Sequence, residues 1–442
     1  MLKKLAGKIE EYFEFSRYGT NWRTELLAGL ATYLSLAYIF IVNPSILSNA
    51  HMDISAVLFA TVIASGLTTI AMGLWARLPF CVAPGLEMDG FFAFVVVGTM
   101  GLTWQEALGA VFWSGVLCVI FSVKGIRQHI IDAIPDGLKK SMAISVGVFV
   151  FTIGLYLAGI VAFNKGAISS IAIHGTPKEI SLLVGLVLSA ALAYKKLRFP
   201  AGILVAIIVC AFYCNSQGIV QAAPAHFSKE MFSGVLKLDV IPHSLRVIPV
   251  FLVFFLIDFY GSIGKFVGLT ASTNLVDKKG NLARFGNALY VDGAGTIGSG
   301  LVGTSSVITY VESAVGISMG GRTGVVAIVC GLLMLLSLVF TPLVGLVPVE
   351  ATSGILCYVG YLLFSSALKD KHLSRPDFAI IALMAAVTFA TFNLGQAMAL
   401  GFLAYTVVHF YKVFRGNMKI NWWLAGSTVA VILSVILQYI IK

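Results

Sequence analysis

Long apolar runs separated by short polar links cover almost the whole chain. A helix needs about 20 mostly apolar residues to cross the hydrocarbon core of a bilayer. Twelve runs of spanning or near-spanning length begin near Leu26, Ile54, Trp104, Leu138, Ser181, Pro200, Val247, Ala288, Arg322, Ala351, Phe378 and Gln396. The pattern therefore predicts an all-α polytopic membrane protein.

Two shorter apolar runs, residues 80–97 and 304–317, differ from the others. Each begins at backbone rich in Pro and Gly or in Gly, Thr and Ser, residues that interrupt regular helix. We expect half-helices there, which brings the number of elements to fourteen. A last apolar run, residues 422–441, is either a fifteenth span or an interfacial tail.

The composition agrees with a membrane protein. The chain is 58% hydrophobic and 11% charged, with a mean hydropathy of +0.94, whereas soluble domains carry about 25% charged residues. The six cysteines all lie in or beside apolar segments, so we expect them to pack as small apolar side chains rather than to bind metal or form disulfides.

The net charge of +10 would suit a nucleic-acid-binding protein, but its distribution does not. If the N-terminus is inside, the even-numbered loops hold Arg77, Lys124, Arg127, Lys139, Lys140, Lys195, Lys196, Arg198, Lys278, Lys279, Arg284, Arg322, Lys369, Lys371, Arg375, Lys412, Arg415 and Lys419. The odd-numbered loops hold only Lys165, Lys178, Lys229, Lys237 and Arg246. By the positive-inside rule, we expect a cytoplasmic N-terminus in a cell (plasma or inner) membrane and no nucleic-acid partner.

The spacing of two carboxylates suggests an internal repeat. Asp89 in the third element and Glu312 in the tenth are 223 residues apart, and two halves of seven elements must have opposite topology. We expect the two residues to be equivalent and to lie near the starts of half-helices that point at each other. Because an ionised carboxylate at the bilayer centre costs roughly 2.5–3.5 kcal/mol, a functional role is favoured over simple helix capping.

These half-helices favour one kind of ligand. Their N-termini offer unpaired N–H donors, and the carboxylates offer acceptors, which together suit a planar heterocycle. Asp258 and Lys265 are two helical turns apart and share a face. Each could neutralise the other, Glu87 or Glu312, as a coupling or ligand site or as a structural ion pair. For Asp292 the functional and structural readings are equally supported.

Other motifs do not suggest an enzyme. The Gly-x-Gly-x-x-Gly pattern at residues 293–298 lacks the strand and helix of a dinucleotide site, and helix packing explains it better. No nucleophile with its base and no set of metal ligands stands out. We therefore expect no catalytic residue, no metal, no cofactor and no enzymatic activity.

Several segments together resemble the nucleobase–ascorbate transporter superfamily, in its azaguanine-permease-like branch of purine permeases. The segments are TELLAGLATYLSLAYIFIVNPSIL (24–47), APGLEMDGFFAF (83–94), TWQEALGAVFWSGV (103–116), GIRQHIIDAIPDGLKKSM (125–142) and GTSSVITYVESAVGISMGGRTG (303–324). The resemblance implies a fold of seven plus seven inverted segments, with segments 3 and 10 half-helical. It also implies proton-coupled or cation-coupled nucleobase uptake, with Glu312 contacting the base.

The chain departs from the family pattern at the binding segments. Glu87 stands where a Gly is usual, and Asp89 where an Asn is usual. In the eighth segment Asp258 matches, Gly261 replaces the acidic residue expected to hold the base, and Lys265 replaces a Thr. We assign substrate binding to Glu312, Asp89, Glu87, Gly261, Ser262, Phe92 and Tyr310, and ion coupling to Asp258, Lys265 and Asp292.

The resemblance also implies a division of the chain into a core domain and a gate domain, with a dimer contact through the gate. Residues 1–24 form a cytoplasmic amphipathic N-terminus; 25–123 and 246–340 form a core domain; 124–220 and 341–442 form a gate domain; 221–245 form an extracellular loop. We expect a permease for a purine or related small heterocycle, working by proton (or other monovalent cation) symport with an elevator-like movement in the lipid bilayer. A homodimer would form through the gate domains. The alternative keeps the fold and carries a non-nucleobase organic ion with altered ion coupling.

Overall fold

The computed structural model describes residues 2–122, 135–164, 167–193, 201–220, 229–241, 246–270, 275, 282, 284–344, 346–368, 374–415 and 421–440. The helices are α1 (Leu2–Tyr12), α2 (Phe15–Tyr18), α3 (Trp22–Leu36), α4 (Ile39–Leu47), α5 (Ile54–Ala71), α6 (Leu86–Gly90), α7 (Trp104–Ser122), α9 (Asp136–Leu157), α10 (Pro177–Leu192), α11 (Gly202–Ser216), α12 (Val247–Thr270), α13 (Phe285–Val302), α14 (Ser313–Ser318), α15 (Gly324–Leu336), α16 (Thr341–Val344), α17 (Ser353–Leu368), α18 (Arg375–Thr391), α19 (Leu394–Phe414) and α20 (Trp422–Ile440). The strands are β1 (Val82–Pro84), β2 (Val161–Asn164), β3 (Ala167–Ile171) and β4 (Val307–Thr309).

The helices confirm an all-α multi-pass membrane protein. Six helical stretches in the described part of the chain are long and apolar enough to span a bilayer: 22–50, 54–76, 104–122, 137–157, 324–344 and 394–414. Each of the other predicted spans also contains an apolar helix. Residues 422–440 form a helix, α20, which packs against α19 and α12; whether it crosses the membrane stays open.

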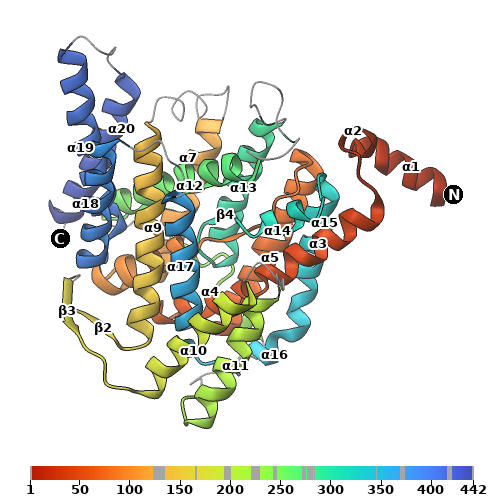
Figure 1. Ribbon diagram of the computed structural model, residues 1–442, viewed down its shortest axis with the longest axis horizontal. Coiled ribbons are helices and arrows are strands. Elements are labelled where there is room, and N and C mark those ends of the chain that lie inside the picture. The colour runs from red at the N-terminus through yellow and green to blue at the C-terminus, as the bar shows by residue number, and fades with distance from the viewer. Residues whose placement is uncertain are drawn as a thin grey trace.

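The helices pack in two groups (Figure 1). α9 contacts α17, α18 and α19, and α10 contacts α11 and α17. On the other side α7 contacts α12 and α13, and α15 contacts α3 and α5. The two ends of the chain lie at opposite ends of the molecule. The division into core and gate domains stays a prediction.

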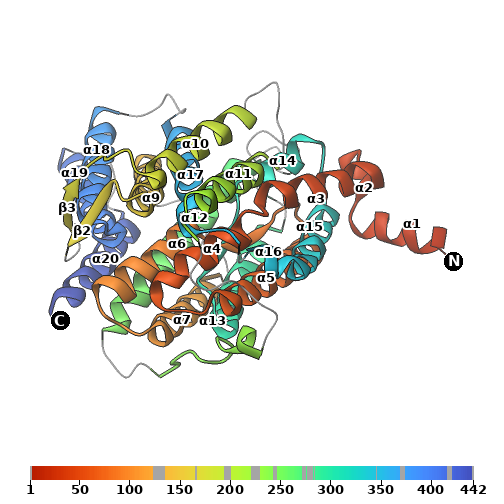
Figure 2. The same cartoon turned by 90° about the horizontal axis from the view of Figure 1, so that it is seen from below.

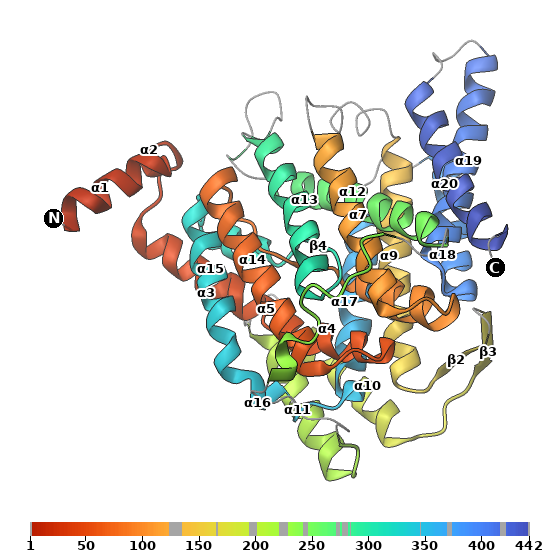
Figure 3. The same cartoon turned by 180° about the vertical axis from the view of Figure 1, so that it is seen from behind.

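Two short strands pair near the centre of the molecule, where β1 packs against α5 and β4 packs against α12 and α13 (Figure 3). β1 and β4 pair antiparallel, with Ala83 opposite Ile308. Their pairing is extended by backbone bonds from Gly85 to Ser306 and from Tyr310 to Cys81, both 3.0 Å. β1 leads into α6, which continues as a π-helix over Phe91–Thr99, and β4 leads into α14. The third and tenth segments are therefore half-helical, as predicted.

The strand register corrects the predicted equivalence of Asp89 and Glu312. The antiparallel register is centred on the pair of Ala83 and Ile308, with Val82 opposite Thr309 and Pro84 opposite Val307. A two-fold axis through that centre maps each residue onto the one 225 positions later (308 − 83), and the two flanking backbone bonds obey it, because Gly85 maps onto Tyr310 and Cys81 onto Ser306. The same offset relates Glu87 to Glu312 (87 + 225). The predicted offset of 223 was wrong by two residues because it used carboxylates, not strands, as the reference. Glu87 is the true counterpart of Glu312.

The N-terminal segment is helical and is held to the rest of the protein by contacts at Tyr12 and Glu14. α1 extends away from the body of the molecule (Figure 2). Glu14, between α1 and α2, accepts a hydrogen bond from Arg17 at 2.6 Å and also pairs with Arg284 at the start of α13. Arg77 lies 3.6 Å from the centroid of the Tyr12 ring and donates to the Tyr12 carbonyl at 2.9 Å.

Several predictions concern residues outside the described ones. Of the basic loop residues, these are Lys124, Arg127, Lys165, Lys195, Lys196, Arg198, Lys278, Lys279, Lys369, Lys371 and Lys419. In the predicted extracellular loop, 221–228 and 242–245 lie outside the described residues.

Candidate functional site

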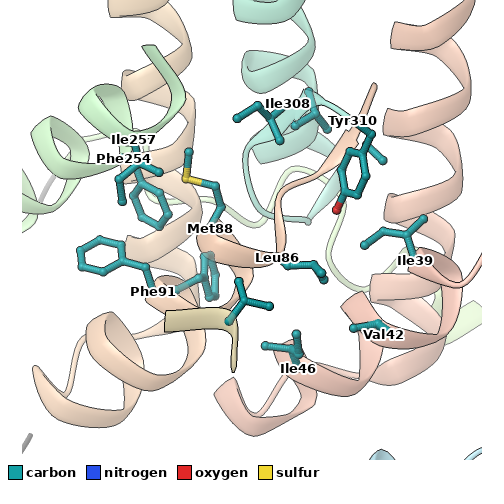
Figure 4. Packing of buried hydrophobic residues seen from close by; sticks show 14 of the residues in the cluster. Ile39, Val42, Ile46, Leu86, Met88, Phe91, Phe254, Ile257, Ile308 and Tyr310 are labelled. Carbon is teal, nitrogen blue, oxygen red and sulfur yellow. The ribbon is translucent and has the colours of Figure 1, made fainter. Parts of the chain in front are cut away.

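The predicted site residues gather where the two strands turn into half-helices. Glu87 and Asp89 lie in the first turn of α6, and Glu312 directly precedes α14. Their surroundings are apolar: Leu86, Met88 and Phe91 of the third segment pack with Ile308 and Phe254 (Figure 4). Charges in such surroundings are costly unless they are paired, so the partners of each carboxylate indicate its role.

Glu87 pairs with Lys265. The Lys265 Nζ lies 3.1 Å from Glu87 Oε1, and the two side chains are only 14% and 5% exposed. The same ammonium lies 5.5 Å from the centroid of the Tyr310 ring, within range of a cation–π contact. The sequence left the partner of Lys265 open among Asp258, Glu87 and Glu312. The structure brings Glu87 into direct contact with it.

Glu312 has an unused acceptor. Its Oε1 accepts a hydrogen bond from the Tyr38 hydroxyl at 2.7 Å. Its Oε2 is buried and has no hydrogen-bond partner among the described residues. Glu312 occupies the N-cap position of α14, but its side chain makes no capping hydrogen bond. Capping therefore does not account for this carboxylate, and one buried oxygen is available to a ligand donor or a proton.

Asp89 is fully engaged. It is completely buried and accepts a hydrogen bond from Ser305, which lies just before β4. In the amide orientation that satisfies both ends of Asn43, its nitrogen donates to the two Asp89 oxygens at 2.9 and 3.1 Å, and its oxygen accepts from Thr61 and Thr304. These bonds connect the first, third and tenth segments, which favours a bracing role. Substrate binding by Asp89 stays a prediction.

Asp258 also lies in a hydroxyl-rich setting. Its carboxylate accepts from Thr296 and Ser306 at 2.9 Å each and from Ser262, one turn later on α12, at 3.3 Å. Thr296 belongs to α13, so the carboxylate connects α12, α13 and the link before β4. Ser262 is thus a partner of Asp258 rather than an isolated binding group. The ion-coupling role of Asp258 stays a prediction.

Gly261 lies beside Glu87. A Cβ at position 261 would lie 4.0 Å from Glu87 Oε1 and 2.8 Å from Cδ1 of Ile308. The absence of a side chain therefore leaves room for the Ile308 side chain and the Glu87 carboxylate. Phe92 is completely buried, with its ring centroid 6.4 Å from that of Phe254, as core packing would require.

Tyr310 and Asp292, the remaining residues assigned to the site, have structural contacts or positions of their own. The Tyr310 hydroxyl donates to the Pro84 carbonyl across the two strands, so it holds the crossing while its ring faces Lys265. Asp292 is buried on α13, one turn before Thr296. No direct contact between Asp292 and the Glu87–Lys265 pair is described, and its coupling role stays a prediction.

Sequence reasoning missed five polar residues of this site: Tyr38, Asn43, Thr296, Ser305 and Ser306. They carry no charge, and single hydroxyls are common in transmembrane helices, so they gave little signal. Asn43 was the exception, because an amide inside an apolar run must find partners.

The arrangement can bind a ligand. It offers a free carboxylate oxygen on Glu312, a carboxylate–ammonium pair and the aromatic face of Tyr310. Among the described residues, no group of three His, Cys, Asp or Glu side chains is arranged to hold a metal ion. The site therefore suits a small ligand with hydrogen-bond donors, or a proton.

Known proteins support a membrane transporter. Residues 23–379 match the Permease family. The chain is 39% identical over 422 residues to a putative permease of Methanocaldococcus jannaschii, covering 94% of this chain and 95% of the relative. It is 34% identical to the adenine permease AdeQ of Escherichia coli (94% and 93% covered) and 33% identical to the guanine/hypoxanthine permease GhxP of Escherichia coli O157:H7 (90% of each covered).

Solved structures support the fold. The transmembrane domain of the cyanobacterial bicarbonate transporter BicA superposes with a TM-score of 0.66 at 14% identity, covering 86% of this chain and 98% of that one. SLC26A9 gives a TM-score of 0.60 at 11% identity, covering 92% and 68%. At such identities the likeness concerns the fold alone, which is the seven-plus-seven inverted-repeat transporter fold. On the sequence matches, the chain belongs to the permease family, as a member of the purine-permease type within the nucleobase–ascorbate transporter superfamily.

Proposed function

We propose that this permease imports a purine nucleobase or a closely related heterocycle. The observation that carries the proposal is the Glu312 Oε2 atom, a buried acceptor without a partner among the described residues. A purine presents ring and exocyclic N–H donors, and one of them would supply the missing hydrogen bond. Relatives named as adenine and guanine/hypoxanthine permeases support this class of substrate.

Proton symport would use the same oxygen. A buried carboxylate oxygen that accepts no hydrogen bond, such as Glu312 Oε2, can take up a proton. An N–H group of the substrate would compete with the proton for the same oxygen. Transport would then couple substrate binding to the protonation state of Glu312. Tyr38 would fix the orientation of the carboxylate through its 2.7 Å hydrogen bond.

Movement would take place between two bodies. The helices that hold the site, α3–α7 and α12–α15, would form the core domain and move as an elevator against a gate domain of α9–α11 and α17–α19. The most extensive helix contacts, α9 with α17, α7 with α13 and α5 with α15, each lie within one of these groups, which supports that division. The gate helices would also supply the homodimer contact. The N-terminus would lie on the cytoplasmic side.

The test is uptake of labelled adenine, guanine, hypoxanthine and uracil by cells that lack their own permeases. Wild type and Glu312→Gln are compared, with and without a protonophore. Because Gln keeps the size of the side chain but carries an amide, it cannot take up the proton. We expect saturable purine uptake that the protonophore and the variant both abolish.

Glu11→Gln, an exposed carboxylate on α1, serves as the matched control and should transport like the wild type. Surface labelling must show equal amounts of each protein in the membrane. Absence of uptake of every base by wild-type protein in the membrane would overturn the proposal. The search would then turn to the alternative, an organic ion outside the nucleobases.

A further inference from the structure

Lys265 places a permanent positive charge at a buried carboxylate of a half-helix. Lys265 extends from α12 to a carboxylate in the first turn of a half-helix, where its Nζ lies 3.1 Å from Glu87 Oε1. Glu87 is the counterpart of Glu312 in the inverted repeat. One of two equivalent carboxylates therefore has a built-in partner, while the other retains a free oxygen.

The charges around Glu87 explain why it needs this partner. Glu312, from the other half-helical segment, and Asp89, on the same helix, are close enough to interact with it electrostatically. Tyr310, directly after β4, and Tyr38, in the link between α3 and α4, also lie close enough to interact with it.

On the side of α6 that packs against α9, the nearest side chains are apolar. The α9 side chains nearest α6, at Gly90, are those of Phe149 and Ile153. Lys265 is thus the cation that the described contacts give to Glu87, and it also interacts with Glu312.

Burial disfavours an ionised carboxylate unless hydrogen-bond donors or a cation accompany it, and the partner that the structure gives Glu87 is a cation. In a transporter that cation can be mobile, as a proton or a metal ion taken from solution, or it can belong to the protein. A lysine at hydrogen-bond distance supplies the charge without any exchange with solution. Glu312 is then the carboxylate whose second oxygen would take up a proton, a cation or a substrate N–H from solution.

We propose that Lys265 is a resident counter-cation: its ammonium replaces a mobile cation at Glu87, so that Glu87 stays ionised throughout the transport cycle. This inference rests on the proposed function and refines it by confining mobile-cation coupling to the Glu312 side of the site. Without the ammonium, Glu87 would have to take up a proton or a metal cation before the site could work. Removal of Lys265 should therefore add a cation requirement that the wild type lacks.

The experiment compares wild type with Lys265→Gln, Glu87→Gln, the double variant and Lys265→Arg in liposomes. Exchange of labelled for unlabelled hypoxanthine is measured, and adenine in parallel, with the same pH on both sides so that no gradient drives the rate. The quantity of interest is the rate of each variant divided by the wild-type rate at the same pH. The double variant also lacks the Lys265 ammonium that acts on Glu312, so it shows how much of any pH dependence belongs to Glu312.

We expect the relative rate of Lys265→Gln to fall by about tenfold or more between about pH 6 and pH 8, as loss of a required proton from a single group dictates. The relative rate of Lys265→Arg should not change with pH, because this variant keeps the charge. The relative rate of the double variant should change less with pH than that of Lys265→Gln, because it has no carboxylate at position 87 to neutralise. Recovery of Lys265→Gln at pH 8 by added sodium would support the same conclusion, with a metal ion as the mobile cation. A Lys265→Gln profile parallel to the wild type, with and without sodium, would overturn it.

A second measurement separates this proposal from the proposed function. Thermal unfolding of the purified proteins in detergent needs no substrate. If Glu87 lacks its cation, the Tm of Lys265→Gln should decrease relative to the double variant as the pH rises, since the buried carboxylate is then forced to ionise. Wild type that exchanges no purine would contradict the proposed function, whereas equal pH dependence of these two Tm values would contradict the role of Lys265.

Discussion

Glu87 and Glu312 occupy equivalent positions, each three residues after the end of a central strand. Their environments nevertheless differ. Glu87 is paired with Lys265 at 3.1 Å, whereas one oxygen of Glu312 accepts a hydrogen bond from Tyr38 and the other has no hydrogen-bond partner within the part of the chain that the structure describes. The inverted repeat places two equivalent carboxylates where the third and tenth segments meet. Residues outside the repeat positions, Lys265 and Tyr38, give these carboxylates different partners. This asymmetry is what allows one carboxylate to be a fixed charge and the other to exchange a proton or bind a donor.

Asp89 is expected to stabilise the crossing of the half-helices. Asp89→Ala would leave Ser305 and Asn43 without their acceptor, and each unsatisfied buried group costs about 1–3 kcal/mol. Asp89→Asn should lose much less, because its amide oxygen still accepts and Asn43 can reorient. Thermal unfolding of the two variants in detergent tests this order. Equal losses for Ala and Asn would mean that the charge of Asp89, and not its hydrogen bonds, matters.

Variants of Asp258 can distinguish a structural role, in which its carboxylate connects α12, α13 and the link before β4, from a role in ion coupling. Asp258→Ala removes the acceptor for Thr296, Ser306 and Ser262, and we expect a loss of stability of about 3 kcal/mol, more than a single net hydrogen bond of about 1 kcal/mol contributes. Asp258→Asn should retain most of the stability. If Asp258 only braces the helices, Asp258→Asn will also keep proton-driven accumulation of substrate. Normal exchange with loss of accumulation in Asp258→Asn would instead identify it as a coupling residue.

Gly261 is expected to be sensitive to a single methyl group. In Gly261→Ala the new Cβ meets Cδ1 of Ile308 at 2.8 Å, and overpacking of this kind costs about 1–3 kcal/mol. Ile308→Val removes that methyl group, so the double variant should be more stable than the sum of the two single changes predicts. Unfolding of all four proteins gives this coupling directly. Additive effects would show that position 261 does not contact Ile308.

Glu14 is expected to hold the N-terminal helices in a pH-dependent manner. The hydrogen bond from Arg17, with further support from Arg284, holds the pKa of Glu14 below its ordinary value of 4.5. A lowered pKa stabilises the folded form above about pH 4.5, and that contribution is lost as the pH falls through the lowered value.

Hydrogen exchange of residues 2–18 measures this contribution. Glu14→Gln should exchange a few-fold faster than wild type near pH 7, and the difference should disappear near pH 3. Glu11→Gln, which alters an exposed carboxylate of the same segment, serves as the control. An unchanged rate for Glu14→Gln would show that its pairs with the arginines do not anchor the helices.

The apolar pattern predicted the architecture well. Length and hydropathy are properties of single segments, so the twelve spans and both half-helices could be located without tertiary information. The repeat offset was wrong by two residues, since strands of three residues such as β1 and β4 leave no periodicity in a sequence. The carboxylates therefore had to serve as landmarks, and Asp89 was equated with Glu312 in place of Glu87.

The pairing inside the site was less predictable. A spacing of seven residues placed Asp258 and Lys265 on one face of a helix, but the choice of partner depends on which segments cross there. Asp258 meets the hydroxyls of Thr296 and Ser306, and Lys265 meets Glu87. Both outcomes follow from the contact of α12 with the strands and α13, which no local pattern encodes.

The most direct test of the central claim is equilibrium binding of labelled hypoxanthine and adenine to purified protein, for wild type and Glu312→Gln. The account predicts saturable binding of at least one purine by the wild type. It also predicts a loss of at least about tenfold in affinity in the variant, about the contribution of one hydrogen bond to a charged group. Binding of equal strength in Glu312→Gln would show that the free oxygen of Glu312 does not hold the substrate and would contradict the account.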